Sequence, residues 1–269
     1  MAIRRKVKKR LWIWGGLVSF LIMTFFILIF YTDIPVWQRI KYYTYKAEFL
    51  FFKNNDINKS IRADFDIYGI DISKYNGNID WDKLMTEGKI NKKPITFVII
   101  KATEGKKLKD RKFKTNWRFA KKKGLLCGAY HFYRPEINSL IQFNNFKETV
   151  RLEKGDFPPV LDVEVRGNLS FERYIQGILN LLKLLENQYG AKPIIYAPPT
   201  LYGSLARNVK LKDYPLWLAT YSMNIPNKHK KNIIFVQYSQ EGRVAGINHH
   251  VDLNGFWGDK LQLQQYLIK

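Results

Sequence analysis

Short apolar runs that end in polar or charged residues recur along residues 66–252. Each run has the length of one buried strand, and longer stretches with apolar residues at helical spacing lie between several of them, at 113–123, 137–152 and 171–189. The predicted strands are residues 66–73, 95–105, 124–134, 158–164, 193–197, 215–221, 233–238 and 246–252. Because strand and helix alternate, the pattern predicts parallel pairing of the strands.

The order of these elements predicts an α/β fold, an irregular TIM-like (β/α) barrel over residues 67–269. Such a barrel carries its site at the C-terminal ends of the strands, which is where the polar residues collect here. The region is at the short end of the size range, roughly 200 to 400 residues, so some helices must be reduced. Residues 215–252 show no clear helix between their strands. A doubly wound open sheet is the alternative, but no Gly-rich phosphate loop follows the first strand.

Asp162 and Glu164 stand two residues apart at the end of the fourth predicted strand. Residues i and i+2 of a strand face the same side, so the two carboxyls are expected to share one pocket. Burial and a neighbouring like charge raise at least one pKa, which keeps a carboxylic acid protonated near neutral pH. The pair predicts acid catalysis on an acetal or ester bond, with a solvated strand end as the alternative.

Six short motifs add a family resemblance. They are YGIDIS at 68–73, FVIIKATEG at 97–105, GAYHF at 128–132, LDVE at 161–164, IIY at 194–196 and VD at 251–252. Each motif alone is weak, but as an ordered set over residues 67–257 they resemble glycoside hydrolase family 25, the Chalaropsis-type lysozymes.

The resemblance implies hydrolysis of the β-1,4 bond between N-acetylmuramic acid and N-acetylglucosamine in peptidoglycan. It implies that Glu164 is the general acid and that Asp162 positions or stabilises the reacting centre. Asp71 and Asp252 are implied to line the same pocket. No cofactor and no metal are expected.

The step after bond cleavage depends on the distance between the two carboxylates. Residues i and i+2 of a strand are roughly 6.5 to 7 Å apart, between the spacings of retaining and inverting glycosidases. Substrate assistance is therefore the favoured hypothesis: the 2-acetamido group attacks its own anomeric carbon while Asp162 steadies it. Tyr196 is expected to donate a hydrogen bond to that acetamide.

Several aromatic and polar residues are candidates for substrate binding, with packing in the core as the alternative for each. The aromatic candidates are Tyr75, Trp81, Tyr130, Tyr133, Trp217 and Tyr221, and the polar one is Gln237. Lys101 is expected to form a structural ion pair with Asp71 or Glu104. Adjacent His249 and His250 face opposite sides of a strand and cannot both ligate one metal ion.

The N-terminus predicts a membrane anchor. Residues 1–10 hold six basic residues, and residues 11–31 contain no charge and are long enough to span a bilayer. Residues 32–66 are expected to form a stalk or linker. The basic tail places the N-terminus in the cytoplasm and the barrel in the periplasm or outside the cell, as a single-pass membrane protein.

The formal charge of +22 leaves 22 − 6 = +16 after the six bases of the tail. This charge favours anionic polymers, and among them peptidoglycan glycan strands are the expected partner. Nucleic acid is not expected, because no nucleic-acid-binding motif is present. The alternative to a lysozyme is a catalytically weak peptidoglycan-binding scaffold. A hydrolase of another polysaccharide is a third reading.

Overall fold

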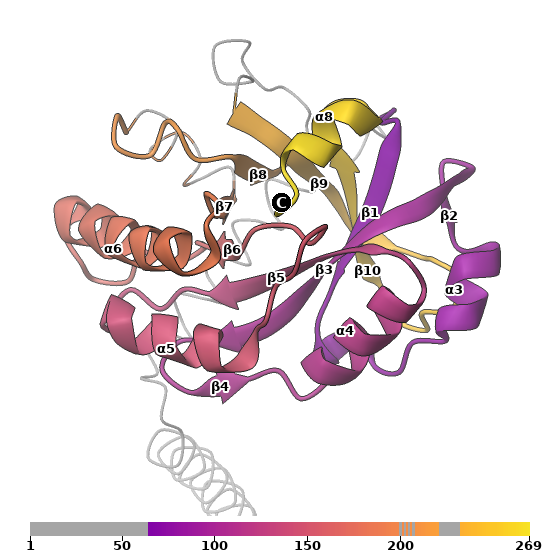
Figure 1. Ribbon diagram of the computed structural model, residues 1–269, viewed down its shortest axis with the longest axis horizontal. Helices are drawn as coiled ribbons and strands as arrows, with labels where there is room; N and C mark the ends of the chain where they lie inside the picture. The colour runs from indigo at the N-terminus through magenta and orange to yellow at the C-terminus, as the bar shows by residue number, and fades with distance from the viewer. Residues whose placement is uncertain (1–63, 199–200, 202, 204, 206–207, 221–231) are drawn as a thin grey trace, which may run out of the picture. The chain divides into compact units, whose positions relative to one another are not determined.

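The computed structural model of the chain describes residues 64–198, 201, 203, 205, 208–220 and 232–269 (Figure 1). The predicted basic tail, membrane span and most of the stalk lie outside these residues, as does Tyr221. Within the described part of the chain, no helix has both the length and the apolar character to cross a membrane. Phe65, at the end of the predicted stalk, is buried against Tyr68, and its amide donates to the Tyr68 hydroxyl at 3.0 Å.

A closed β-barrel forms the centre of the described residues. In the ten-stranded sheet, the strand at residues 67–72 pairs with the strand at residues 93–104, and this pairing closes eight of the strands into a barrel. These strands are β1 (Ile67–Ile72), β3 (Lys93–Glu104), β5 (Leu126–Phe132), β6 (Val160–Asp162), β7 (Ile194–Ala197), β8 (Leu216–Ala219), β9 (Ile233–Gly242) and β10 (Val251–Phe256). The short strands β2 (Lys89–Ile90) and β4 (Leu108–Lys109) pair only with β3. The predicted TIM-like barrel is confirmed.

The last strand departs from the prediction in both bounds and direction. β10 begins at Val251 rather than at Gly246, and it runs antiparallel to both β1 and β9. Only residues 243–250 separate β9 from β10, which is too short for a parallel crossover. The reversal places Asp252 at the start of its strand, yet at the same end of the barrel as the C-terminal ends of the other strands.

The helices cover the outside of the barrel. They are α3 (Trp81–Glu87), α4 (Phe113–Lys122), α5 (Ser139–Thr149), α6 (Phe171–Tyr189) and α8 (Lys260–Gln265), with a 3-10 turn η1 (Lys74–Asn76) after β1. Figure 1 shows α5 and α6 together on one side and α3 and α4 on the other. The helix α6 matches its predicted bounds, because Ser170 caps its start and Gly190 adopts a left-handed conformation, φ 66°, at its end.

Alternation along each strand separates two cores. On β1, Tyr68, Ile70 and Ile72 face the helices, whereas Ile67 belongs to the core inside the barrel. Gly69 also faces inward: a Cβ there would lie 2.4 Å from the Phe97 ring, so only glycine leaves room for this ring. The next inward position, two residues on, is Asp71, which lies at the open end of the barrel, hereafter the mouth.

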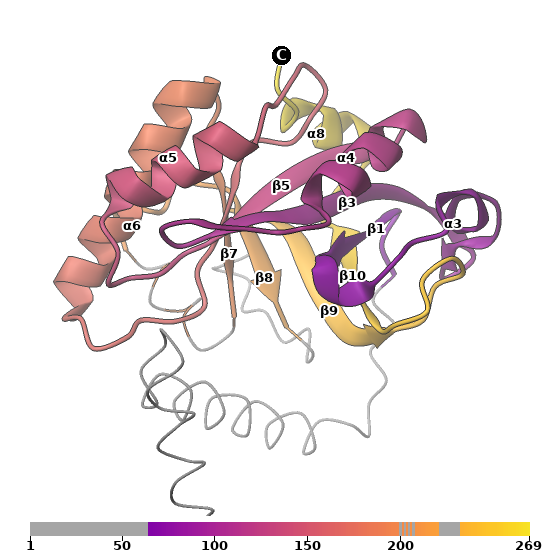
Figure 2. The same cartoon turned by 90° about the horizontal axis from the view of Figure 1, so that it is seen from below.

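The opposite end of the barrel, the base, is closed by the C-terminus. The Ile268 amide donates to the Asp156 carbonyl at 2.9 Å, and Asp156 precedes β6. Figure 2 shows α8 and the C-terminus at the far end of the barrel from the tips of β7 and β8. The C-terminus therefore does not cover the acidic residues of the mouth.

Candidate active site

The mouth gathers the inward-facing residues at one end of the barrel. One pleat deeper, β6, β7, β9 and β10 carry apolar side chains, whereas β1 and β5 carry Gly69 and Gly128, so the polar residues form a layer above an apolar core. The members of this layer are Asp71 on β1, Tyr130 on β5, Asp162 on β6, Tyr196 on β7, Gln237 on β9, and Asp252 and Asn254 on β10.

Asp71 and Asp252 form a carboxyl pair. They are direct partners in the antiparallel β1–β10 register, and their side chains are hydrogen-bonded to each other. Gln237 Nε2 donates to Asp71 Oδ2 at 2.9 Å, and Asn254 Nδ2 donates to the same oxygen at 2.8 Å. Burial and the nearby charge of Asp71 raise the pKa of Asp252 to about 9. Burial also raises the pKa of Asp71, against the lowering effect of the two amides that donate to it. The pair therefore retains at least one proton near neutral pH, and Asp71 is the better acceptor.

The side chains of Tyr196 and Trp217 orient the two amides that donate to Asp71. The Tyr196 hydroxyl donates to Gln237 Oε1 at 3.0 Å, and Trp217 Nε1 donates to Asn254 Oδ1 at 2.9 Å. Since each amide oxygen accepts a hydrogen bond from an aromatic side chain, the NH2 group of the same amide points toward Asp71. The sequence analysis did not identify Asn254, although its position two residues after Asp252 places it on the same face of β10.

Asp162 and Glu164 lie across the mouth. β6 ends at Asp162, so Glu164 lies just beyond the strand rather than within it. Asp162 is 6% exposed, and its Oδ1 has no hydrogen-bond partner among the described residues. Burial and the charge of Glu164 raise the pKa of Asp162 well above its usual value, and burial raises the pKa of Glu164 to about 7. The two carboxyls therefore retain at least one proton near neutral pH.

A cluster of opposite charges stands beside this pair. Lys101 Nζ lies 2.7 Å from Glu104 Oε2, and Arg134 Nε donates to Glu104 Oε1 at 3.0 Å. The ion pair of Lys101 with Glu104 is one of the two predicted alternatives, and the one with Asp71 is not formed. Lys101 and Arg134 both lower the pKa of Glu164, against the larger effect of burial. Arg134 was not predicted from the sequence.

The predicted aromatic contacts have different environments. Tyr130 is half-buried, and burial followed by the charge of Asp162 raises its pKa well above its usual value, so its hydroxyl remains a donor. Trp217 is 2% exposed and packs edge-on against Tyr196 at 4.7 Å, so it reaches the acids through Asn254 rather than through an open ring face. Tyr75 is 74% exposed on η1, outside the acid layer.

His131 and Cys127 have structural environments. His131 is buried, with Nδ1 2.7 Å from Thr103 Oγ1 and Nε2 3.1 Å from Gln142 Oε1, and burial lowers its pKa to about 4. Cys127 is buried, and burial raises its pKa to about 12. In the described part of the chain, no three or more His, Cys, Asp or Glu side chains are placed to hold a metal ion. A reaction without a cofactor stays a prediction.

Comparison with known proteins agrees with this geometry. Residues 70–247 match glycosyl hydrolases family 25. The uncharacterized protein YegX of Escherichia coli K12 is 39% identical over 207 residues, which cover 77% of this chain and 75% of that protein. Lysozyme M1 of Streptomyces globisporus is 28% identical over 211 residues, covering 73% of this chain and 70% of that protein.

The fold agrees as well. A family 25 glycosyl hydrolase from Bacillus anthracis superposes with a TM-score of 0.66 at 28% identity, covering 75% of this chain and 94% of that chain. The resemblance carried by the six sequence motifs is thereby confirmed. The chain is a glycoside hydrolase that belongs to glycosyl hydrolases family 25.

Proposed function

We propose that this protein is a membrane-anchored lysozyme that hydrolyses the β-1,4 bond between N-acetylmuramic acid and N-acetylglucosamine in peptidoglycan. The observation that carries the proposal is the carboxyl pair of Asp162 and Glu164 at the mouth, which retains a proton near neutral pH. The family and the similarity to Lysozyme M1 support this choice of substrate. An acetal bond needs an acid of this kind, because the leaving oxygen must be protonated as the bond breaks.

In this proposal Glu164 is the general acid. Its pKa of about 7 lies close to neutral pH, where a carboxyl can both give up a proton and take one back. Glu164 is half-buried beyond the end of β6, whereas Asp162 is enclosed. Glu164 is therefore the member of the pair that is accessible to a glycosidic oxygen.

Asp162 stabilises the reacting sugar in the proposed mechanism. Its Oδ1, which has no partner among the described residues, accepts a hydrogen bond from the N–H of the 2-acetamido group. The acetamide oxygen then bonds to the anomeric carbon as the glycosidic bond breaks, and the leaving oxygen takes the Glu164 proton. Water opens the resulting ring, and Glu164 accepts a proton from that water.

The proposal gives Tyr196 a role in orienting a neighbouring amide. A phenol has one proton, and that of Tyr196 is donated to Gln237. In the proposal Tyr196 orients Gln237 toward Asp71, and its donation to the acetamide, which would need this bond to be exchanged, stays a prediction. Tyr130, whose hydroxyl is electrostatically coupled to Asp162 and Asp71, takes the place of that donor in the proposal.

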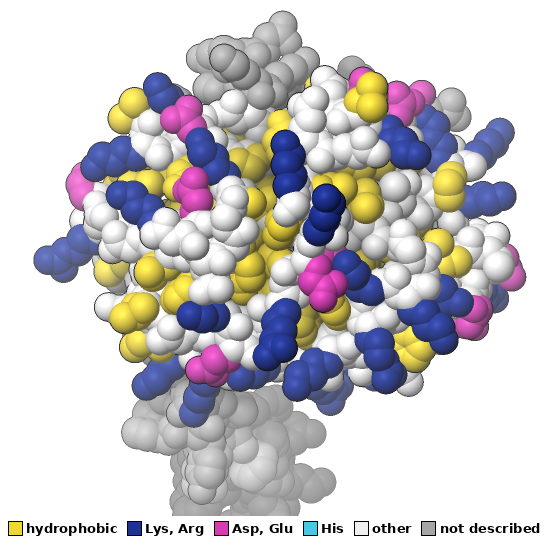
Figure 3. Space-filling model, in the orientation of Figure 1, with side chains coloured by type: hydrophobic (Ala, Val, Ile, Leu, Met, Phe, Trp, Pro, Cys, Tyr) yellow, Lys and Arg dark blue, Asp and Glu magenta, His cyan; other side chains and the backbone are white. Residues whose placement is uncertain are grey.

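The proposal keeps the predicted cellular arrangement. Residues 11–31 anchor the chain, residues 1–10 lie in the cytoplasm, and the barrel lies in the periplasm or outside the cell. Peptidoglycan is found on that side of the membrane. Figure 3 shows Lys and Arg spread over the visible face with few acidic side chains among them, which suits an anionic polymer.

Muropeptide release from purified peptidoglycan tests the proposal. The full chain should produce new reducing ends on N-acetylmuramic acid, and Glu164→Gln should lower their rate of formation by about 10²- to 10⁴-fold. Glu172→Gln, an exposed change on α6, is the matched control and should be fully active. Intact glycan with retained binding would instead identify a peptidoglycan-binding scaffold. Clean inversion at the anomeric carbon, measured by NMR, would exclude substrate assistance.

A further inference from the structure

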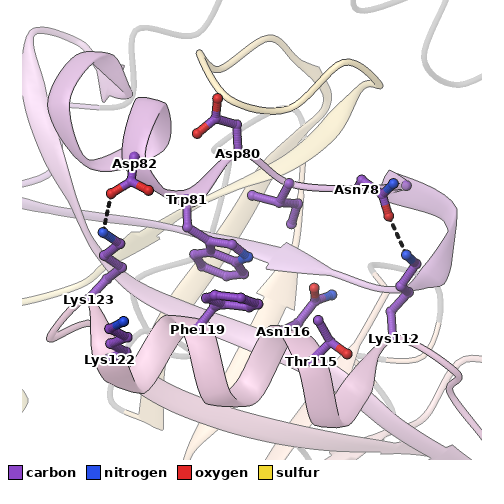
Figure 4. A pocket seen from close by; sticks show the side chains of 12 residues that line it. Asn78, Asp80, Trp81, Asp82, Lys112, Thr115, Asn116, Phe119, Lys122 and Lys123 are labelled. Carbon is purple, nitrogen blue, oxygen red and sulfur yellow. Dashed lines mark hydrogen bonds and ion pairs between the residues drawn. The ribbon is translucent and has the colours of Figure 1, made fainter.

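A cavity lies outside the mouth, between the helix α4 and residues 77–82, which form a loop and the first residues of α3 (Figure 4). Its volume is about 370 Å³, and none of the acids of the mouth lines it. Sites for small molecules commonly have volumes of about 300 to 1,000 Å³. The cavity is therefore large enough for a ligand and distinct from the catalytic residues.

One wall of this cavity is aromatic. Trp81 begins α3 and Phe119 lies on α4, and Figure 4 shows the two rings facing each other across the space between the helices. Trp81 is 6% exposed, so its ring is fixed by packing, and Phe119 is half-buried. A fixed aromatic wall suits the apolar face of a sugar ring or the methyl group of an acetamide.

Asn116 contributes an unsatisfied amide to the same cavity. The residue is 2% exposed and lines the cavity, and its Nδ2 has no hydrogen-bond acceptor among the described residues. Buried amide groups are rarely left unpaired, because desolvation without a partner costs free energy. Rotation about the broad χ2 of asparagine can turn the NH2 group toward a carbonyl oxygen in the cavity.

The charges around the cavity are mainly positive. Three lysines and two aspartates line it, giving 3 − 2 = +1. Lys123 is paired with Asp82, and Figure 4 shows Asp80 turned away from α4. Lys112 donates to the neutral amide of Asn78, and neither Lys112 nor Lys122 forms an ion pair within the described residues. Two lysines without carboxylate partners thus stand at opposite ends of the cavity.

We infer that this cavity is an accessory binding site for a carboxylate-bearing N-acetylated sugar of the glycan strand. The sugar ring lies against Phe119, with the buried Trp81 ring behind this wall, the acetamide carbonyl accepts from Asn116, and the carboxylate meets Lys122 or Lys112. N-acetylmuramic acid carries all three groups on one sugar where its lactyl carboxylate is free of a stem peptide, so the inferred ligand is glycan from which the peptides have been removed. The inference rests on the proposed function for the identity of the polymer, and it adds a second point of attachment that does no chemistry.

The position of the cavity suits such a role. The loop at 77–82 follows β1 and η1, so it leaves the barrel at the mouth, a few residues after Asp71. The Lys74 amide donates to Asp110 Oδ2 at 2.9 Å, which holds this loop close to the start of α4. The cavity extends along α4 from Lys112 at the mouth end to Lys122 and Lys123 at the other end, so a glycan strand held there lies along the side of the barrel. Such attachment raises the effective concentration of the strand at the mouth and increases avidity for the polymer without a new catalytic contact.

Calorimetric titration with a soluble disaccharide, N-acetylglucosaminyl-N-acetylmuramic acid, tests the inference. The full chain with Glu164→Gln, which cannot consume the ligand, should bind at two sites. Adding Phe119→Ala, which removes an apolar contact, or Lys122→Glu, which reverses a charge at the exposed end of the cavity, should weaken one of them at least about tenfold. Lys114→Glu changes the same charge on the exposed face of α4, outside the cavity, and should leave both sites intact.

The outcomes separate this inference from the proposed function. A single site unaffected by Phe119→Ala and Lys122→Glu overturns the accessory site, while muropeptide release by the unmodified chain still supports the lysozyme. Competition by inorganic phosphate, together with indifference to Phe119→Ala, also overturns it, because the cavity would then bind any anion. Two sites in a chain that releases no muropeptides would support the accessory site and refute the lysozyme.

A further variant separates a ligand-binding role of Asn116 from a structural one. Asn116→Leu removes the unpaired amide and keeps a similar side-chain volume. If the amide serves a ligand, this variant should lose the second site without a lower thermal midpoint. A lowered midpoint with both sites retained would show that Asn116 stabilises the fold and would overturn its role as a donor to the sugar.

Discussion

The inner face of the barrel has two halves. Both are lined largely by side chains of the same strands, but one half is aromatic and the other is polar and acidic. Toward the base, four phenyl rings pack together with centroids 4.9 to 5.9 Å apart: Phe97, Phe157, Phe235 and Phe256. One pleat higher, Phe235 gives way to Gln237 on β9, and Phe256 gives way to Asn254 on β10. A step of two residues changes an apolar core into a hydrogen-bonded acid layer.

The difference shows how the barrel separates stability from chemistry. The lower half buries apolar rings in mutual contact, which favours the folded state. The upper half buries carboxyls whose pKa values are raised, so their charged forms are disfavoured by the folded state. The aromatic half therefore supplies the stability on which the acid layer depends. Changes in the two halves should consequently affect different measurements.

The largest effect is expected in the lower half. Phe235 is fully buried and lies beside the rings of Phe97, Phe157, Trp217 and Phe256. Phe235→Ala should lower the free energy of unfolding by about 3 to 5 kcal/mol, because it removes buried surface and leaves a cavity. Urea denaturation measures this change, and Phe235→Leu, which keeps most of the volume, is the control. A loss below about 1 kcal/mol would contradict the assigned role of this half.

A change in the acid layer should show the opposite behaviour. Asp162→Asn removes a buried carboxyl that is repelled by Glu164, so the free energy of unfolding should stay the same or rise. The rate of formation of reducing ends should fall by about 10²- to 10³-fold, since the amide can still accept a hydrogen bond but carries no negative charge to stabilise the reacting sugar. If Asp162→Asn were as destabilised as Phe235→Ala, the two halves would not be separable.

A smaller effect is expected where the two halves meet. Asn254 accepts from Trp217 and donates to Asp71, so Asn254→Leu leaves a buried indole N–H without its acceptor. The free energy of unfolding should fall by about 1 to 3 kcal/mol. Trp217→Phe removes the other partner of the same bond, and the double variant should lose less than the sum of the single losses. If the two losses were additive, the hydrogen bond between Trp217 and Asn254 would contribute no coupling free energy.

The smallest effect concerns the pH dependence of activity. The acid must be protonated, and the pKa of Glu164 is about 7, so activity should decline as pH rises through about 7. Lys101 lowers the pKa of Glu164, so Lys101→Met should move this decline to higher pH, by less than about one unit. Lys106→Met, an exposed lysine after β3, is the control and should leave the profile unchanged. A shift to lower pH would contradict the assignment of Glu164 as the acid.

Much of the barrel could be predicted from the sequence, because its strands are short apolar runs with clear ends. The direction of β10 was predicted wrongly, although the eight residues at 243–250 are too few for a parallel crossover. Loop length was the signal for the reversal, and the apolar pattern alone does not contain it. The error hardly affected the site, since an antiparallel strand brings Asp252 to the mouth by its first residues.

The site was predicted less completely. The acids were found because charged residues at strand ends are conspicuous, and Asp71, Asp162 and Asp252 do meet at the mouth. Asn254 and Arg134 were missed, since an amide within a strand and an arginine after one have many ordinary structural roles. The partners of Tyr196 and Trp217 depend on which strands become neighbours, and spacing along the chain does not define those distances.

The antiparallel last strand also decides where the domain can be held. Because β1 begins at the base and β10 returns to it, both the entry to β1 near residue 64 and the C-terminus lie on that side, opposite the mouth. A segment joined at either chain end of this domain is therefore attached at the base of the barrel. For an enzyme whose substrate is a meshwork rather than a diffusing molecule, such attachment leaves the open face unobstructed, and immobilisation through Lys269 should preserve access to the polymer.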